Sequence, residues 1–198
     1  AIILDREEIK TGEEAFLQLR LEEPVVALPG DRFVIRSYSP VFTIGGGEIL
    51  DAFPARHKRL SEQVKEEMAI LEKGSDDEKI RLRLLKARPA GLSWPELVMR
   101  SNLLPSKLRP LVDQLIAKGG ILRFNGDRLR YLHPQVMADL KRFSLDYLKA
   151  FHQKNPLQTG AMKEELKSKL PPHVDVRLFN HLLSALIEEK KILAEKET

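Results

Sequence analysis

The chain has 198 residues, of which 42% are apolar and 31% charged, and its formal net charge is +4 at pH 7. That size predicts two or three small domains rather than one large one. The absence of cysteine excludes disulfides and thiolate metal sites and fits a reducing cytoplasm. No apolar run approaches the roughly 20 residues that cross a bilayer, and no signal-like segment opens the chain, so we expect a soluble protein without a membrane partner.

The charge is unevenly distributed along the chain. Residues 1–53 carry 5 basic and 10 acidic side chains, residues 54–134 carry 17 and 10, and residues 135–198 carry 11 and 9. The net charges are therefore −5, +7 and +2. The middle segment is the candidate for binding a polyanion, although such an excess also fits an ordinary solvated surface.

Two strands are predicted near the N-terminus, at residues 1–5 and 15–21, with a turn at Thr11-Gly12. In the second strand the apolar residues share one face, namely Ala15, Leu17, Leu19 and Leu21. The polar residues share the other, namely Gln18, Arg20 and Glu22. We therefore expect one packed and one hydrated face.

Residues 31–51, DRFVIRSYSPVFTIGGGEILD, predict two further strands with a bent end. Phe33 and Ile35 alternate with more exposed positions, and Ser39-Pro40 interrupts the apolar pattern. Three glycines follow, but Glu48 comes after them instead of the lysine and hydroxyl residue of a phosphate loop. Close backbone approach at a barrel corner is the favoured interpretation, without an NTPase site. Three or four strands in this length indicate an incomplete sheet, so we expect the chain to begin inside a domain.

Helices are predicted after the basic connector 54–60, PARHKRL. The first runs to about Lys73. Ser75 to Glu78 form a capping box for the second, which Pro89 to Gly91 end, and Ser93 to Glu96 cap a short third helix through about Ser101.

The next helix is predicted from about Ser106 to Gly119-Gly120, followed by a hairpin with Asn125-Gly126 as its turn. Its apolar stripe consists of Leu108, Leu111, Val112, Leu115 and Ile116. Helices followed by a hairpin are typical of a winged helix.

This pattern recurs 71 residues later, which predicts two copies of one module. Leu111-Val112, Leu115-Ile116 and Ile121-Leu122 correspond to Leu182-Leu183, Leu186-Ile187 and Ile192-Leu193. In the second copy Asp175 is the predicted N-cap of the equivalent helix, and a strand is predicted at residues 192–194. The polar residues off its apolar stripe are Arg177, Asn180, His181 and Ser184. No room remains for a returning wing strand.

Catalytic chemistry has little support in the sequence. The five histidines have no spacing that would bring metal ligands onto one helix face, no nucleophile elbow occurs, and the carboxylates fall mainly at caps and charged faces. We therefore expect no catalytic site, metal site or cofactor in this chain.

The FVIRSYSP and TIGGGEILD portions, with residues 16–29 ahead of them, resemble the end of the third domain of selenocysteine-specific translation elongation factors (SelB), a barrel of the elongation factor Tu type. The helical modules resemble the winged-helix extension of that family. The expected fold is α+β, a partial antiparallel β-barrel followed by tandem winged-helix domains. The expected boundaries are residues 1–53, 54–134 and 135–198, with the last module truncated at its wing.

The resemblance implies a cytoplasmic, monomeric factor that hydrolyses GTP with magnesium in a first domain absent from this sequence. It also implies that the factor brings selenocysteinyl-tRNA to the ribosome at UGA codons and is tethered to an mRNA hairpin. The main mRNA contact in the family lies in the last of four winged helices. This chain is therefore expected to be an RNA-associated scaffold rather than an enzyme.

The candidate nucleic-acid-binding residues are Lys107, Arg109, Lys118, Arg123, Arg128, Arg130, Arg177 and His181. The resemblance also places Arg36, Ser39 and Thr43 near the T arm of the tRNA, although these side chains could instead finish a strand edge. The first winged helix could alternatively be a rigid arm or a protein-docking module, and a rigid arm needs a packed interface at residues 51–60.

A second function remains open, a winged-helix DNA-binding transcriptional regulator with a β-rich N-terminal domain. That function predicts a dimer with a preference for palindromic duplex DNA, whose half-sites lie about one helical turn apart.

Overall fold

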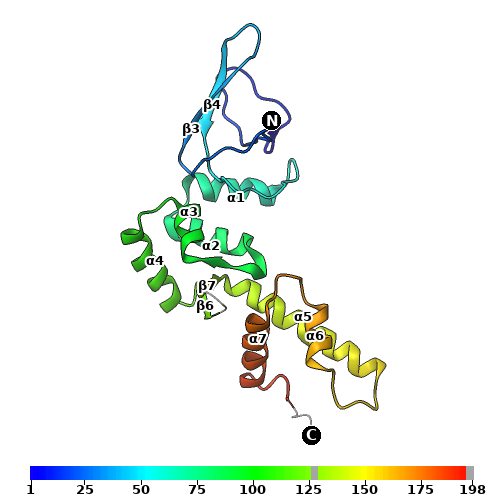
Figure 1. The fold of residues 1–198 in the computed structure, drawn as a ribbon. Helices are drawn as coiled ribbons and strands as arrows, with labels where there is room; N and C mark the ends of the chain where they lie inside the picture. The colour runs from blue at the N-terminus through cyan, green and yellow to red at the C-terminus, as the bar shows by residue number, and fades with distance from the viewer. Residues whose placement is uncertain (126–128, 195–198) are drawn as a thin grey trace. The chain divides into compact units, whose positions relative to one another are not determined.

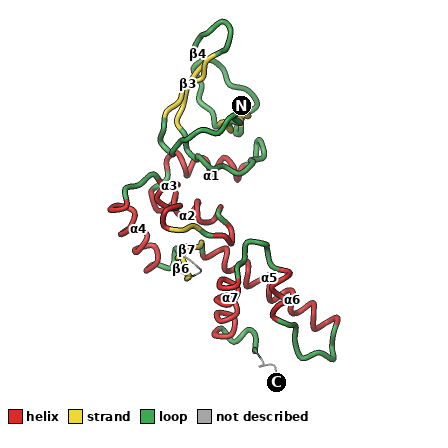
Figure 2. The backbone as a smooth tube through the Cα atoms, viewed as in Figure 1, coloured by secondary structure: helices red, strands yellow, loops and turns green. Residues whose placement is uncertain are grey.

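The computed structural model describes residues 1–125 and 129–194 of the chain. The fold is α+β, and Figure 2 shows the strands and loops of the N-terminal stretch giving way to helices from α1 onwards. The residues form two compact units, Ala1–Arg83 with Pro95–Leu111 (unit 1) and Leu84–Trp94 with Val112–Thr198 (unit 2).

The first two strands of unit 1 are shorter than predicted. β1 (Ile2–Ile3) pairs antiparallel with β2 (Leu17–Gln18), and Ile2 lies opposite Gln18. The predicted faces of the second strand are wrong in part, since Gln18 is 8% exposed and Leu21 is 59% exposed. The reason is a hydrogen-bonding partner far along the chain: the Gln18 amide donates to the carbonyl of Ala55, so burial leaves it satisfied.

The predicted hairpin with a bent end is confirmed. β3 (Arg32–Arg36) pairs antiparallel with β4 (Thr43–Glu48), as Figure 1 shows. The pairing register shifts between Ile35 and Arg36. A Cβ on Gly46 would lie 2.6 Å from the carbonyl oxygen of Phe33, and one on Gly47 would lie 2.9 Å from the Phe33 ring. The glycines therefore allow the close backbone approach that the sequence indicated.

The helices of unit 1 begin where the sequence predicted. α1 (Glu62–Lys73) follows the basic connector, and α2 (Asp76–Lys86) begins at the capping box. The Ser75 backbone amide donates to Glu78 Oε2 at 2.9 Å, and the Glu78 amide donates to Ser75 Oγ at 3.4 Å. The reciprocal bonds satisfy two amides that the first turn leaves without helical partners.

One apolar core joins the strands of unit 1 to its helices. Its buried residues are Leu4, Val64, Met68, Leu71 and Leu82. Partly buried side chains from the strand region pack against them, namely Ile2, Phe16 and Leu50. The strand region and helix α1 therefore do not have separate cores. The packed interface that a rigid arm needs was expected at residues 51–60, but none of these residues belongs to this core and most of them are exposed.

Two further helices begin close to their predicted positions, and the second buries its predicted apolar stripe. α3 (Trp94–Ser101) begins at the predicted position after a 3₁₀ turn, η1 (Arg88–Ala90). α4 (Pro105–Ala117) buries Leu108, Val112 and Leu115 as predicted. The periodicity of the apolar residues thus determined which side of α4 is covered.

Unit 2 contains a three-stranded sheet in the order β5-β7-β6. The predicted hairpin is confirmed as β6 (Leu122–Asn125) and β7 (Leu129–Leu132), and its predicted turn falls partly outside the described residues. Strand β5 (Leu92–Ser93) was not predicted. It follows Gly91, whose φ is +58° and where a Cβ would lie 2.5 Å from the Tyr131 carbonyl oxygen, so the start of β5 requires glycine.

The remaining helices of unit 2 are α5 (Pro134–Lys154), α6 (Lys163–Lys169) and α7 (Val176–Glu188). Asp175 caps α7 as predicted, because its carboxylate accepts from the Leu178 amide at 2.7 Å. The strand predicted at residues 192–194 is wrong. The amide of Lys191 donates to the Leu186 carbonyl and closes the helix, and no strand in the described part of the chain pairs with the residues that follow.

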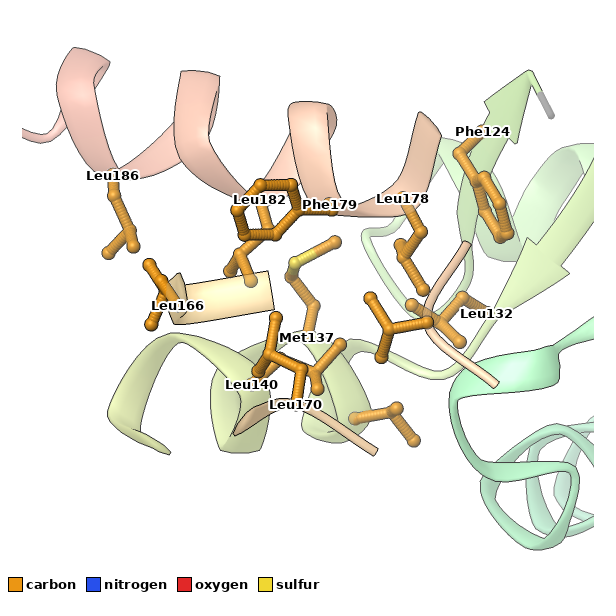
Figure 3. Close-up of a cluster of buried hydrophobic side chains, with 12 residues drawn as sticks. Phe124, Leu132, Met137, Leu140, Leu166, Leu170, Leu178, Phe179, Leu182 and Leu186 are labelled. Atoms are coloured by element: carbon orange, nitrogen blue, oxygen red, sulfur yellow. The ribbon is translucent and has the colours of Figure 1, made fainter. Parts of the chain in front are cut away.

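The core of unit 2 is formed mainly by α5, α6 and α7 (Figure 3). Its buried residues include Met137, Leu140, Leu166, Leu178, Leu182 and Leu186. The predicted repeat is confirmed for one helix of each module, because α4 and α7 both have 13 residues and begin 71 positions apart. Leu115 and Leu186, which correspond in the repeat, are both buried.

Candidate nucleic-acid interface

The candidate cations on α4 lie on two different flanks of the helix. Lys107 and Lys118 are exposed and, at 3.6 residues per turn, fall on the same flank of the buried stripe. Lys118 follows the last residue of α4, but its amide still bonds to the Gln114 carbonyl at 3.0 Å and keeps the helical position. Arg109 is exposed on the opposite flank. Helix α4 therefore does not present all three cations to one groove.

The two described wing arginines lie on opposite faces of the hairpin. Arg123 lies opposite Tyr131, and Arg130 lies opposite Phe124, so the pairing register places their side chains on different faces. Arg123 is exposed, whereas Arg130 is half-buried and donates to the carbonyls of Ala90, at 2.9 Å, and Gly91. Arg130 thus braces the turn before β5. Arg128 lies outside the described residues.

The candidates on α7 share one side of that helix. Arg177, His181 and Ser184 are exposed and follow one another at intervals of four and three residues. The buried side chains of α7 lie on the other side, and they include Leu178 and Leu182. The exposed row of α7 is therefore contiguous, unlike the set on α4 and the wing.

The candidate tRNA-proximal loop is exposed and closed by its own hydrogen bonds. Arg36, Ser39 and Thr43 are all exposed. Ser37 closes the loop, because its amide donates to the Phe42 carbonyl at 2.9 Å and its hydroxyl donates to the Pro40 carbonyl. Arg36 and Thr43 are directly paired across the hairpin, so they lie on the same face of it.

Three polar side chains that the sequence did not single out fasten α2 and α3 to the strand region within unit 1. The buried Arg83 guanidinium donates to the Leu50 carbonyl at 3.3 Å, and its desolvation lowers the pKa of Arg83, which the nearby Asp51 opposes. Asn102 donates to the Pro29 carbonyl at 2.7 Å. The Arg100 guanidinium lies 5.0 Å from the centre of the Phe53 ring, a cation–π contact. No local pattern signals these contacts, since each joins residues far apart in the sequence.

Neither a metal cluster nor a membrane helix is found in residues 1–125 and 129–194. No group of three or more histidine, aspartate or glutamate side chains could hold a metal ion there. None of the helices in that part of the chain has the length and apolarity needed to span a bilayer.

Comparisons with known proteins place the chain in a class of translation factors. Residues 3–56 match the family described as "Selenocysteine-specific elongation factor, beta-barrel domain". Residues 145–198 match the family described as "Elongation factor SelB, winged helix". Both matches agree with the fold, in which a strand region precedes helical modules, and together they define a translation elongation factor with β-barrel and winged-helix domains.

A curated relative spans nearly the whole chain. The selenocysteine-specific elongation factor of Desulfomicrobium baculatum is 27% identical over 194 residues, which cover 98% of this chain and 30% of that protein. The chain therefore belongs to the SelB family of selenocysteine-specific elongation factors and spans about a third of the length of this relative.

The three glycines of β4 do not form a phosphate loop for GTP, the nucleotide that the resemblance to the SelB family implies. Gly45, Gly46 and Gly47 are paired with β3 in an antiparallel ladder, and Phe33 lies where a side chain at Gly46 or Gly47 would otherwise be. A phosphate loop needs a run of free backbone amides that curve around an anion. Residues 43–48 therefore offer no GTP site.

Proposed function

We propose that this chain is an RNA-associated scaffold in a selenocysteine-specific elongation factor, between a GTPase and tRNA-binding core and an mRNA-binding end. The observation that carries the proposal is the order of the matches, a SelB β-barrel domain at residues 3–56 and a SelB winged helix at residues 145–198. A DNA-binding regulator does not explain the barrel match.

In this proposal the whole factor is a cytoplasmic monomer that brings selenocysteinyl-tRNA to the ribosome at UGA codons and is tethered to an mRNA hairpin. GTP and magnesium act in a domain outside these 198 residues. The exposed loop with Arg36, Ser39 and Thr43 lies near the tRNA, and the exposed cations of the winged helices lie near RNA phosphates.

The packing of unit 1 supports a rigid connection rather than a flexible linker. Leu4 from the strand region and Val64 from α1 are buried in the same core, so moving one element away from the other would expose apolar surface. Arg83 and Asn102 add hydrogen bonds from α2 and from the end of α3 to the strand region. A factor that must hold tRNA and mRNA sites at a fixed separation gains from such a connection.

The test is binding of the chain to a labelled mRNA hairpin, with a duplex DNA of matched length as the comparison. RNA phosphate contacts predict an affinity that falls with salt, at about 0.7 to 0.9 in the log–log slope per contact. Lys118→Glu is expected to weaken RNA binding, whereas Lys154→Glu, another exposed lysine at the end of a helix, is the matched control. Affinity that is tight and independent of salt would contradict the phosphate contacts. A dimer that prefers palindromic DNA would establish the regulator instead.

A further inference from the structure

The basic connector, residues 54–60, is fastened to the strand region of unit 1 at four points. The Gln18 side chain donates to the Ala55 carbonyl at 2.8 Å and accepts from the His57 amide at 3.3 Å. The Arg59 guanidinium donates to the Ile3 carbonyl at 3.1 Å, and the Leu60 amide donates to the Leu4 carbonyl at 2.7 Å. The backbone of the connector is therefore held along its length.

Two cations of this fastened segment remain available to solvent. Arg56 and Lys58 are exposed, while His57 between them is half-buried. Within the described residues neither cation forms an ion pair or side-chain hydrogen bond. Arg59, by contrast, is used by the carbonyls of Ile3 and Glu7. The two exposed cations follow directly after residues 1–53, whose net charge is −5, so the positive charge begins at the connector.

The arrangement suits a chain of phosphates. The Gln18 side chain bonds to the Ala55 carbonyl and the His57 amide on either side of Arg56, as a neighbouring strand would. Positions two residues apart in a strand are separated by about 6 to 7 Å and point to the same side, which is the spacing we infer for Arg56 and Lys58. A backbone that is already ordered reduces the entropy lost on binding. Between Pro54 and Arg59 the connector has no large apolar side chain, whereas protein interfaces depend on buried apolar and aromatic anchors.

We propose that Arg56 and Lys58 form an RNA phosphate-binding site on the connector, separate from the candidate cations of α4, the wing and α7. This inference rests on the proposed function, because that function makes RNA the polyanion. The site contacts the backbone of one strand and carries no sequence information.

The first experiment measures binding of the full chain to a labelled RNA stem-loop over a range of salt concentrations. Arg56→Gln with Lys58→Gln is expected to weaken binding about fivefold at low salt, as the loss of two exposed ion pairs would. The log–log salt slope is expected to fall by about 1.4 to 1.8. The matched control is Lys73→Gln with Arg81→Gln, which removes the same charge from exposed positions on α1 and α2 of unit 1. An equal loss in the control would overturn the site in favour of net charge.

A second variant tests whether the fastening matters. Gln18→Ala keeps both cations but removes the amide that holds Ala55 and His57. It is expected to weaken RNA binding with the salt slope unchanged. Binding equal to that of the unaltered chain would show that a fixed backbone is not needed and would reduce the site to two free cations.

The outcomes distinguish failure of this site from failure of the proposed function. If the connector variant binds RNA as well as the unaltered chain while Lys118→Glu binds more weakly, the connector site is wrong and the proposed function stands. If the unaltered chain does not bind RNA, both are wrong. If polyglutamate of equal charge competes as well as the RNA, the connector binds acidic protein segments and the RNA site is overturned.

Discussion

The two units of this chain are stabilised in different ways. Unit 2 has a large core built mainly from leucines on α5, α6 and α7, and in its described part the Arg130 guanidinium bonds to the distant carbonyls of Ala90 and Gly91. Unit 1 has a smaller core, and polar side chains fasten its segments to one another: Gln18, Arg59, Arg83 and Asn102 all bond to backbone atoms far along the chain.

The difference teaches where each unit is sensitive to substitution. Truncation of an apolar side chain in unit 2 loses burial and leaves a cavity, whereas truncation of a polar side chain in unit 1 leaves backbone groups without partners. The next four predictions test this contrast.

The largest effect is expected for Leu182→Ala in unit 2. Leu182 is 0% exposed, and truncation of a buried leucine costs about 2 to 5 kcal/mol of unfolding free energy. Trp94, the one tryptophan of the chain, belongs to unit 2, so its fluorescence in urea reports that unit. Leu193→Ala is the control, because Leu193 is 93% exposed and its loss should change little. Equal effects of the two variants would contradict the described core.

Gln18→Ala should destabilise unit 1 by about 1 to 3 kcal/mol, the cost of buried groups that lose their partners. The Ala55 carbonyl and the His57 amide both lose a bond. Hydrogen exchange of the His57 amide and of the amides in α1 measures the effect, while Trp94 fluorescence should show unit 2 unchanged. Arg20→Ala, on the same stretch but exposed, is the control. Unaltered exchange at His57 would show that the Gln18 contacts contribute nothing.

A pair of variants at Asn102 separates a hydrogen bond from backbone strain. Asn102 has φ +52° and donates to the Pro29 carbonyl. Asn102→Gly removes the bond but allows the backbone angle, so it should cost about 1 kcal/mol. Asn102→Ala removes the same bond and keeps a Cβ at this left-handed angle without the short polar side chain that lets asparagine adopt it, so it should cost about 1 kcal/mol more. Equal stability of the two variants in urea denaturation followed by far-UV circular dichroism would contradict the strained backbone.

The smallest effect is expected from an exposed ion pair in unit 2. Lys141 and Lys191 lower the pKa of the Glu189 carboxyl to about 2 from its usual 4.5. A lowered pKa in the folded state gives stability above pH 4.5 that is lost as the pH falls toward 2. Glu189→Gln should therefore flatten the acid side of the stability profile, measured as urea midpoints between these values, and salt should reduce the effect. Glu188→Gln is the control. If it flattened the profile equally, the acid-side stability could not be attributed to the ion pairs of Glu189.

Local patterns in the sequence were sufficient for helices α1 to α4 and α7, and for the hairpins of β3 with β4 and of β6 with β7. The stripe with Leu108 and Leu115 identified the buried side of α4, and Asp175 identified the start of α7. Residues whose environment depends on distant partners were not predictable in this way. The sequence predicted Gln18 to face solvent, because its hydrogen-bonding partner, Ala55, lies 37 positions away and is not visible in the local pattern.

The candidate interface was predictable as a set of residues but not as a surface. Charge counts and the winged-helix pattern selected Arg123 and Arg130, whereas only the pairing register shows that they lie on opposite faces. The two-residue strand β5, which pairs with β7 at Arg130, is too short to leave a periodic signal. The role of each candidate in RNA binding stays a prediction.

The common core of β1 and α1 also limits how the factor can be dissected or redesigned. A truncated variant that began at the connector would lose Leu4 and leave Val64 and Met68 uncovered, so solubility would suffer before any RNA contact was lost. Extra residues inserted between Ala55 and Leu60 would not lengthen a flexible linker, because the connector is hydrogen-bonded to the strand region. They would disrupt the folded unit 1, so the distance between the two ends of the factor would have to be changed at another place in the chain.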